Sequence, residues 1–335
     1  MDGASLHVSV VLPCFNASDT LRAAVDSIRH QTLIEWECII ADDGSTDDSP
    51  DIAAQIATRD HRVRLLRLPH AGIVHALQAG CAEVRAPFIA RMDADDIALP
   101  QRLEKQVRFM QAHPDTALCG THVQMFGKTV KAGRRRYERW LNSLETHDDI
   151  VRELFIECPI AHPAFFMRRQ TFERVGGYED HGWAEDYDLC MRFFLEGARF
   201  GMVPEPLLQW RESPDRLSMR AKRYDPTRFR KLKRAYLLRS YLANRPRFHQ
   251  WGAGEVGKLW LREWKGLQPE AVIDINPRKI GRAIHGVPVI APDDLPGPDE
   301  TFIVIAVGAP GARDEIRAWL APRGYAELHD FLFVA

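Results

Sequence analysis

Residues 8–16 read VSVVLPCFN, and residues 88–96 read FIARMDADD. Each stretch starts as a short apolar run and then turns polar within a few residues. Continuous apolar runs of this length are typical of strands that are buried on both faces of a parallel sheet. The polar residues that follow them are therefore expected at the ends of buried strands.

A regular alternation of strand and helix patterns connects these two stretches. It runs strand 8–12, helix to 30, strand 37–41, helix 47–59, strand 63–68, helix 72–83 and strand 88–92. The alternation predicts an α/β fold with a mostly parallel sheet and helices on both faces. Ligands of such sheets bind beyond the carboxyl ends of the strands, and Pro13, Asp42 and Asp93 lie at three of these ends.

The acidic cluster after the fourth strand needs a partner. Asp93, Asp95 and Asp96 place three carboxylates within four residues, and like charges this close repel each other. A divalent metal that bridges to a phosphate is a common neutraliser of such a cluster. The cluster therefore predicts a site for a metal and a diphosphate at the edge of the sheet.

Composition limits the class of protein. The chain has 335 residues and a formal net charge of −1, which favours two domains and gives no argument for nucleic-acid binding. Its six cysteines are scattered without a C-x-x-C pair, as expected of free thiols in a reducing compartment. No apolar run has the length of a signal peptide or a spanning helix. We expect a cytoplasmic protein, and attachment to a membrane surface stays open.

The pattern continues less regularly beyond residue 96. Pro100 to His113 is an amphipathic helix, and His162 to Met167 is a strand candidate. A helix from Ala184 to Glu196 starts with Glu185 and Asp186, and acidic residues in the first turn of a helix are stabilised by its dipole.

A second α/β pattern occupies the C-terminal part. Gly252, Gly254 and Gly257 form a G-x-G-x-x-G motif between a strand pattern and a helix, and Asp274 ends the next strand pattern. In dinucleotide folds such glycines let a pyrophosphate approach the helix N-terminus, and an acid at this spacing binds ribose. We predict a first domain at 1–220, a basic helical connector at 221–245 and a Rossmann-like domain at 246–335.

Five motifs in order resemble those of family 2 glycosyltransferases with the nucleotide-diphospho-sugar transferase (GT-A) fold. They are VSVVLPCFN (8–16), DDGSTD (42–47), RMDADD (91–96), GGY (176–178) and AEDYDL (184–189). The resemblance covers roughly residues 6–220. Each motif alone is weak, but together they fall on the predicted strand ends.

The resemblance implies a donor pocket. Asp43 would accept a hydrogen bond from the nucleotide base, which in uridine-using relatives is the uracil N3–H, and Pro13 and Phe15 would line the pocket for base and ribose. An alternative for the acidic run is a turn that caps the following helix. Asp47 and Asp48 look like ordinary helix-start residues.

The resemblance also implies a DxD element at Asp93-Ala94-Asp95. Asp95 would bind Mg²⁺ or Mn²⁺ bridging the diphosphate, and Asp93 would hold the ribose or a metal-bound water. The metal would neutralise the charge that develops on the leaving nucleoside diphosphate. Asp96 is expected to be structural.

Asp186 would be the catalytic base, with Glu185 beside it orienting the acceptor or the donor sugar. Inverting sugar transfer needs one carboxylate that deprotonates the acceptor hydroxyl. His162 reads either as a contact to the acceptor or the diphosphate or as a hydrogen-bonded core residue. Trp183 reads either as a sugar-stacking platform or as a core residue. Near Arg211, relatives often carry Arg-x-His over the diphosphate, and this chain has no histidine there.

The C-terminal part resembles the nucleotide-sugar-binding N-terminal domains of sugar acyltransferases. Because it is short for a full dinucleotide fold, we expect a module for binding, oligomerisation or structure rather than a dehydrogenase. A nucleotide or nucleotide sugar is its candidate ligand.

The sequence thus predicts a metal-dependent inverting glycosyltransferase that moves a sugar from a nucleotide-diphosphate donor, with a UDP-sugar favoured, to a hydroxyl of a saccharide or lipid-linked acceptor. Cell-surface polysaccharide or glycoconjugate synthesis fits this activity. The rivals are an NAD-dependent sugar oxidoreductase and a non-catalytic nucleotide-sugar-binding protein. Whether the chain forms homo-oligomers stays open. Arg134–Arg136 and Arg139 either make a peripheral membrane contact or form a solvated basic loop.

Overall fold

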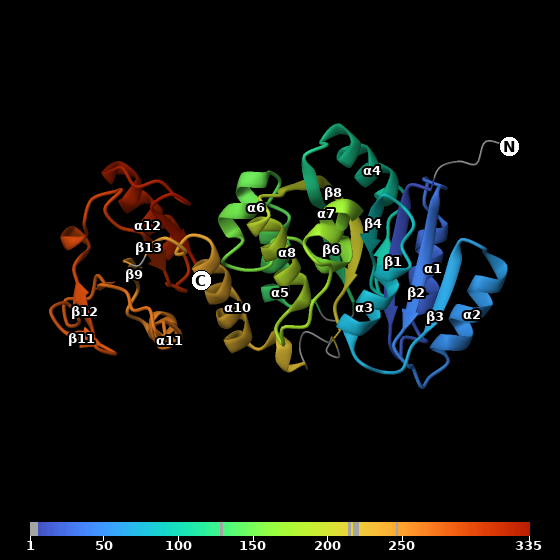
Figure 1. Ribbon diagram of the computed structural model, residues 1–335, viewed down its shortest axis with the longest axis horizontal. Helices are drawn as coiled ribbons and strands as arrows, with labels where there is room; N and C mark the ends of the chain where they lie inside the picture. Colours follow the sequence, from blue (N-terminus) through green and yellow to red (C-terminus); the bar gives the residue numbers. More distant parts are fainter. Residues whose placement is uncertain (1–5, 128–129, 214–215, 217–220, 246) are drawn as a thin grey trace. The chain divides into compact units, whose positions relative to one another are not determined.

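The chain folds into two compact units in the computed structural model, which describes residues 6–127, 130–213, 216, 221–245 and 247–335 (Figure 1). Unit 1 contains residues 1–150 and 159–221, and unit 2 contains residues 151–158 and 222–335. Residues 214–215 and 217–220, where the predicted first domain ends, lie outside the described residues.

The two units differ from the predicted domains at two places. The predicted connector contains helix α10 (Pro226–Arg239), which belongs to unit 2. Leu232, Tyr236 and Leu237 of this helix are buried, so it is part of a folded unit rather than a free linker. Residues 151–158, which lie inside the predicted first domain, also belong to unit 2.

Unit 1 is built on one mixed sheet. Its strands are β1 (Val8–Cys14), β2 (Trp36–Asp42), β3 (Val63–Arg67), β4 (Phe88–Arg91), β5 (Ile97–Ala98), β6 (Thr116–Phe126), β7 (Phe166–Arg168) and β8 (Arg199–Arg211). Its helices are α1 (Leu21–Arg29), α2 (Ser49–Arg59), α3 (Ile73–Ala82), α4 (Arg102–Ala112), α5 (Ala132–Leu141), α6 (His147–Glu153), α7 (Arg169–Arg174) and α8 (Glu185–Leu195), of which α6 ends in unit 2.

The strand order is β3-β2-β1-β4-β7-β6-β8-β5. The neighbours among β3, β2, β1 and β4 are parallel, which confirms the α/β fold predicted for this part of the chain. Beyond β4 the sheet is mixed, because β7 is antiparallel to both β4 and β6, and β6 is parallel to β8.

Helices cover both faces of the parallel strands (Figure 1). Val10 and Leu12 of β1 lie in one hydrophobic cluster with Leu21 of α1. Val11 faces the other side, where a Cβ added to Gly80 of α3 would lie 2.7 Å from its Cγ1. Because both faces are covered, polar groups gather at the carboxyl edge of the strands, where ligands bind in this class of sheet.

The predicted strand at His162–Met167 is only partly a strand. His162–Ala164 form a 3-10 turn, and strand β7 begins at Phe166. Pro163 has no backbone N–H, so it cannot donate to a strand ladder.

Unit 2 contains a second, smaller sheet. Its strands are β9 (His249–Trp251), β10 (Val272–Ile273), β11 (Ala283–Ile284), β12 (Val287–Ile290), β13 (Ile303–Ile305) and β14 (Phe331–Phe333), and its further helices are α11 (Glu255–Glu263) and α12 (Ala312–Leu320). The order is β11-β12-β10-β9-β13-β14. Strand β11 lies at one edge and is antiparallel to its neighbour. The other five strands are parallel, and when they are numbered along the chain their order in the sheet is 3-2-1-4-5, which is the order of a doubly wound sheet.

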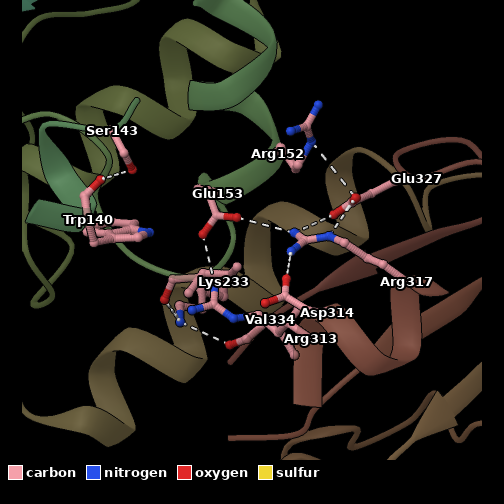
Figure 2. A network of polar contacts seen from close by, with 11 residues as sticks. Trp140, Ser143, Arg152, Glu153, Lys233, Arg313, Asp314, Arg317, Glu327 and Val334 are labelled. Atoms are coloured by element: carbon pink, nitrogen blue, oxygen red, sulfur yellow. Dashed lines mark hydrogen bonds and ion pairs between the residues drawn. The ribbon is translucent and has the colours of Figure 1, made fainter. Parts of the chain in front are cut away.

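The segment 151–158 is held in unit 2 by a network of charges (Figure 2). Glu153, which is 8% exposed, accepts hydrogen bonds from Arg313 at 2.8 Å and Arg317 at 3.3 Å. Arg317 also pairs with Glu327 at 2.9 Å. The Lys233 ammonium donates to the carbonyl oxygens of Ile156 and Val334 at 2.5 and 3.1 Å. Burial lowers the pKa of Lys233 to about 8.

Replacing Glu153 by glutamine is expected to lower the free energy of unfolding of unit 2 by about 1–2 kcal/mol, because two guanidinium groups lose a charged acceptor while remaining partly exposed. Urea unfolding followed by tryptophan fluorescence measures the change. The matched control is Glu270→Gln, whose ion pair with Arg247 is exposed and should contribute little. Equal shifts for the two variants would contradict the expected role of Glu153.

None of the helices in the described ranges combines the length and the apolar character needed to cross a membrane.

Candidate active site

Three carboxylates follow strand β4 and face one another. Asp93, Asp95 and Asp96 each place a carboxylate oxygen within 4.8 Å of the others. Asp96 is fully buried, whereas Asp93 and Asp95 are partly exposed. Oxygen donors clustered in this way have the chemistry that Mg²⁺ and Mn²⁺ prefer.

The pKa values of Asp95 and Asp96 are raised, first by burial and next by neighbouring carboxylates. Burial, and next the charge of Asp93, raise the pKa of Asp95 to about 6. Burial and both neighbouring carboxylates raise the pKa of Asp96 well above its ordinary value. One Asp96 oxygen accepts from the Arg211 backbone N–H at 2.7 Å, while the other is buried without a partner among the described residues. The surroundings of Asp95 and Asp96 therefore disfavour the charged carboxylate.

Arg91 is a buried cation that pairs with this cluster. Its guanidinium group is 4% exposed and pairs with Asp93 at 2.6 Å. Its Nε and one terminal nitrogen have no hydrogen-bond partner among the described residues. Arg102, also buried, donates to the Arg91 carbonyl oxygen at 2.8 Å and fixes the end of strand β4.

Two further arginines reach the cluster from the end of strand β8. Arg211 donates to the Asp95 carbonyl oxygen at 2.6 Å. The charge of Arg216 lowers the pKa of Asp95, although burial outweighs it. Arg216 pairs with Glu212 at 2.8 Å, and its guanidinium carbon lies 4.6 Å from the centre of the Trp210 ring. Arg211 and Arg216 thus add positive charge close to Asp95.

Asp43, after strand β2, is buried and engaged with the loop that follows strand β3. Its carboxylate accepts hydrogen bonds from the backbone N–H groups of Ala71 and Gly72, and it pairs with His70 Nδ1 at 2.9 Å. The residue is only 3% exposed. Three donors thus contact the Asp43 carboxylate, and its predicted contact with a nucleotide base stays a prediction.

Phe15 and Pro13 lie at the end of strand β1. Pro13 is buried in the strand, whereas Phe15 is 46% exposed. The Phe15 ring stacks on the His70 ring, with 4.3 Å between centroids and 20° between planes. An exposed aromatic pair thus stands beside Asp43, where the sequence predicts the base pocket.

Glu185 and Asp186 begin helix α8, as predicted. Glu185 is buried and lies 3.7 Å from His162 Nδ1, while Asp186 is half-buried. His162 is bonded through Nε2 to the Tyr178 hydroxyl at 2.8 Å. Burial, and next the Arg91 charge, lower the pKa of His162 well below its usual value, so this ring is neutral.

These contacts connect the two acidic groups. Arg91, which pairs with Asp93, interacts electrostatically with both His162 and Tyr178. Tyr178 in turn feels the charges of Glu185 and Asp186, although burial is the main reason its pKa is raised. Arg91, His162 and Tyr178 thus form a chain of buried groups between Asp93 and the start of helix α8.

Asp188 and Trp183 have structural contacts. Asp188 is fully buried and accepts from the Trp183 indole N–H and from Arg192, both at 2.8 Å. Trp183 is half-buried. Its hydrogen bond fixes the segment that leads into helix α8.

The glycine motif of unit 2 is explained by close packing at two of its three positions. Gly252 has a φ of +113°, and a Cβ on Gly257 would lie 1.9 Å from the Gly252 carbonyl oxygen. A Cβ on Gly254, which precedes helix α11, would meet nothing within 4 Å. Asp274 accepts from the Ala253 backbone at 3.0 Å and from Lys279 at 2.9 Å. The predicted ribose acid is thus occupied by its own loops.

Arg91 pairs with Asp93, and its charge and those of Glu185 and Asp186 all act on Tyr178. Phe15 and Asp43 lie at the carboxyl edge of neighbouring strands. It adds side chains that the sequence patterns did not select, namely His70, Arg91 and Arg216. His70 follows strand β3 as Asp43 follows strand β2, so its position after a strand was the available signal. Arg216 had no such signal.

The profile of Glycosyl transferase family 2 matches residues 9–176. The putative glycosyltransferase EpsE of Bacillus subtilis is 31% identical over 222 residues, which cover 65% of this chain and 77% of EpsE. The amylovoran biosynthesis glycosyltransferase AmsE of Erwinia amylovora is 30% identical over 218 residues, which cover 63% of this chain and 79% of AmsE.

Among solved structures, residues 1–349 of TarS from S. aureus align with a TM-score of 0.55 at 16% identity. The alignment covers 69% of this chain and 65% of the TarS chain, so this chain spans less than two thirds of that structure.

Unit 1 has the GT-A fold. The chain belongs to glycosyl transferase family 2 and is a glycosyltransferase.

Proposed function

We propose that the protein transfers a sugar from a nucleotide-diphosphate donor to a hydroxyl acceptor, with inversion and with the help of a divalent cation. The observation that carries the proposal is the trio of carboxylates beyond strand β4, whose oxygens lie within 4.8 Å of one another.

Asp95 and Asp93 are the residues proposed to hold Mg²⁺ or Mn²⁺, with Ala94 giving them their spacing. The hard oxygen donors and the raised pKa of Asp95 fit a divalent cation. When bound, the cation supplies positive charge to the departing nucleoside diphosphate. Arg216 and Arg211 stand beside the cluster and are proposed to bind the same phosphates.

A uridine nucleotide is the favoured donor. A structure of TarS is described as a complex with UDP-GlcNAc, and a mannosyltransferase from Pyrobaculum calidifontis as a complex with GDP-Man and Mn²⁺. Both relatives share the fold of unit 1, so their ligands support a nucleotide sugar here without choosing its base. The proposed base pocket contains Pro13, Phe15 and Asp43.

Asp186 is the proposed base. It is half-buried at the start of helix α8, so its carboxylate can take a proton from an acceptor hydroxyl that attacks the anomeric carbon opposite the diphosphate. Glu185 is buried, and we propose that it orients the acceptor or the donor sugar. His162 and Tyr178 support that position with an uncharged hydrogen bond.

The proposed acceptor is a saccharide or a lipid-linked sugar used in cell-surface polysaccharide synthesis. AmsE is named for amylovoran biosynthesis, and a relative from Escherichia coli is named for O-antigen biosynthesis. Arg135, Arg136 and Arg139 of helix α5 are exposed and offer a surface for an anionic acceptor or membrane. We propose that the reaction takes place in the cytoplasm. A peripheral contact of the protein with the membrane is compatible with this location.

For unit 2 we propose a module that binds a nucleotide or nucleotide sugar. The support is the doubly wound strand order together with the open surface at Gly254 before helix α11. The occupied carboxylate of Asp274 speaks against ordinary ribose binding in a dinucleotide enzyme, and thus against an NAD-dependent oxidoreductase.

A panel of UDP-, GDP- and dTDP-sugars, each with Mn²⁺ and with EDTA, tests the activity. We expect release of nucleoside diphosphate from one base class, and its loss with EDTA. Absence of release from every donor, together with oxidation of NADH on sugar substrates, would overturn the proposal in favour of an oxidoreductase.

A further inference from the structure

The chain enters unit 2 once before its C-terminal part. It leaves unit 1 after Ile150, contributes residues 151–158 to unit 2 and returns to unit 1 at Pro159. These eight residues lie inside the part of the chain that matches the family profile, residues 9–176. A domain that was merely appended to the C-terminus of a transferase would need a single crossing. Residues 151–158 therefore link unit 2 to the interior of the transferase sequence.

Charged and apolar contacts hold residues 151–158 within unit 2 (Figure 2). Glu153 accepts hydrogen bonds from Arg313 and Arg317 of helix α12, at 2.8 and 3.3 Å. Ile156 packs against the hydrophobic cluster of the second sheet. Hydrogen bonds between a carboxylate and guanidinium groups are stronger than those between neutral groups. Glu153 is therefore a polar anchor of this segment.

The chain that returns to unit 1 is fixed beside strand β4. Ile160 is 1% exposed and packs so closely on strand β6 that a Cβ on Gly120 would lie 2.5 Å from its Cγ2. The Phe165 carbonyl oxygen accepts from the backbone N–H of Arg91 at 2.9 Å. Arg91 ends strand β4, and the carboxylate cluster follows it. The returning segment is thus part of the wall behind the candidate site.

His162 lies in the middle of this returning segment. Its Nε2 is bonded to the Tyr178 hydroxyl at 2.8 Å, and its Nδ1 lies 3.7 Å from the Glu185 carboxylate. Glu185 precedes Asp186 at the start of helix α8. A displacement of His162 would therefore disturb the residues next to the proposed base.

The connection between the two anchored parts is short. Ile156 in unit 2 and Ile160 in unit 1 are four positions apart, so the chain between them spans at most about 14 Å. Pro159 lies in this connection, and its ring fixes φ and removes part of the remaining freedom. A movement of the segment in unit 2 is therefore transmitted to the returning segment.

We propose that Glu153 is a positioning residue for sugar transfer. By holding residues 151–158 in unit 2, it fixes the start of the segment that carries His162, and through His162 it supports the start of helix α8. This inference rests on the proposed role of Asp186 as the base. It gives unit 2 a part in the reaction that does not depend on a ligand bound to unit 2.

Hydrogen–deuterium exchange of the peptide 160–166, measured by mass spectrometry, tests the link in Glu153→Gln. The amides of Ala164 and Phe165 are bonded within the 3-10 turn. We expect their exchange to become about tenfold faster, because weaker charged hydrogen bonds increase the population in which the segment is released. Exchange in helix α1 of unit 1 should stay unchanged.

Steady-state kinetics test the consequence for the reaction, with release of nucleoside diphosphate as the readout. In Glu153→Gln we expect kcat to fall about three- to tenfold, while KM for the donor stays within about twofold, since no proposed donor contact comes from residues 151–164. Arg313→Gln should show the same split if Glu153→Gln fails to fold. Arg313→Lys keeps the positive charge and should retain kcat within about twofold of the wild type.

Val272→Ala is the matched control for the stability of unit 2. Val272 is fully buried in strand β10 and lies outside the hydrophobic cluster against which Ile156 packs. Its truncation should lower the urea midpoint of unit 2 and leave both kcat and the exchange of the peptide 160–166 unchanged. Equal effects of Val272→Ala and Glu153→Gln on kcat would overturn the positioning role in favour of a general loss of stability.

The remaining outcomes separate this inference from the proposed function. Faster exchange with an unchanged kcat in Glu153→Gln would overturn the positioning role, and so would a lower kcat with unchanged exchange. Absence of nucleoside diphosphate release by the wild-type protein with every donor would overturn the proposed function instead. The exchange experiment would then still show whether Glu153 holds the returning segment.

Discussion

Replacing Asp186 by asparagine is expected to reduce sugar transfer by about 10²–10⁴-fold while leaving donor binding within about twofold of the wild type. The variant keeps the size of the side chain but cannot take the proton of the acceptor hydroxyl, and general-base catalysis contributes this much in other enzymes. Donor binding should survive because the proposed metal and phosphate contacts come from Asp93, Asp95 and the arginines. Turnover is measured as release of nucleoside diphosphate, and binding by titration calorimetry.

Glu196→Gln is the control for this prediction. Glu196 ends helix α8 and forms an exposed ion pair with Arg174, so its loss should leave turnover nearly unchanged. Near-normal turnover in Asp186→Asn would show that another group is the base. A parallel loss of donor binding would show instead that Asp186 belongs to the donor pocket.

The second large effect is expected for Asp95→Asn. Loss of a residue that merely supports metal ligands costs about 10–100-fold in metal affinity, so loss of the proposed ligand itself should weaken Mn²⁺-dependent nucleotide binding by at least about 100-fold. The folded protein should not be weakened at pH 7. Because the pKa of Asp95 is raised to about 6, the folded state disfavours its charged form, and this unfavourable charge is absent in asparagine.

The two readouts separate function from folding. Mn²⁺ titrations of nucleotide binding report the ligand role, and the thermal midpoint without metal reports stability. Asp51→Asn is the control, since Asp51 is an exposed acid of helix α2. An unchanged Mn²⁺ titration in Asp95→Asn would reject its role as a ligand, whereas a large drop in the midpoint would mean that its charge supports the fold.

Local sequence patterns were sufficient for the parallel half of the sheet. The strands that become β1 to β4 are short apolar runs separated by helices, so burial on both faces is visible in the residues themselves. Their carboxyl ends share one edge by geometry, which is why Asp93 and Asp43 could be placed there in advance.

The longest strands were not visible in this way. Strands β6 and β8 are 11 and 13 residues long, yet no strand was predicted at either position. Strand β8 contains Pro204 and Pro206, and strand β6 contains Gly120, residue types that local patterns assign to turns or edges. Pairing between distant segments stabilises both strands, and a local window does not contain that information.

The residues of the candidate site also divide into those that the sequence predicts and those whose contacts only the tertiary structure shows. The sequence by itself determined the α/β fold, the family motifs and the cluster of Asp93, Asp95 and Asp96, because these depend on residue type and short spacing. Only the tertiary structure decided that the 70–72 loop bonds to Asp43, that His70 stacks on Phe15, and that the Arg91 charge acts on His162 and Tyr178. Hydrogen bonding and burial are properties of groups that meet in space, and these groups come from segments far apart in the chain.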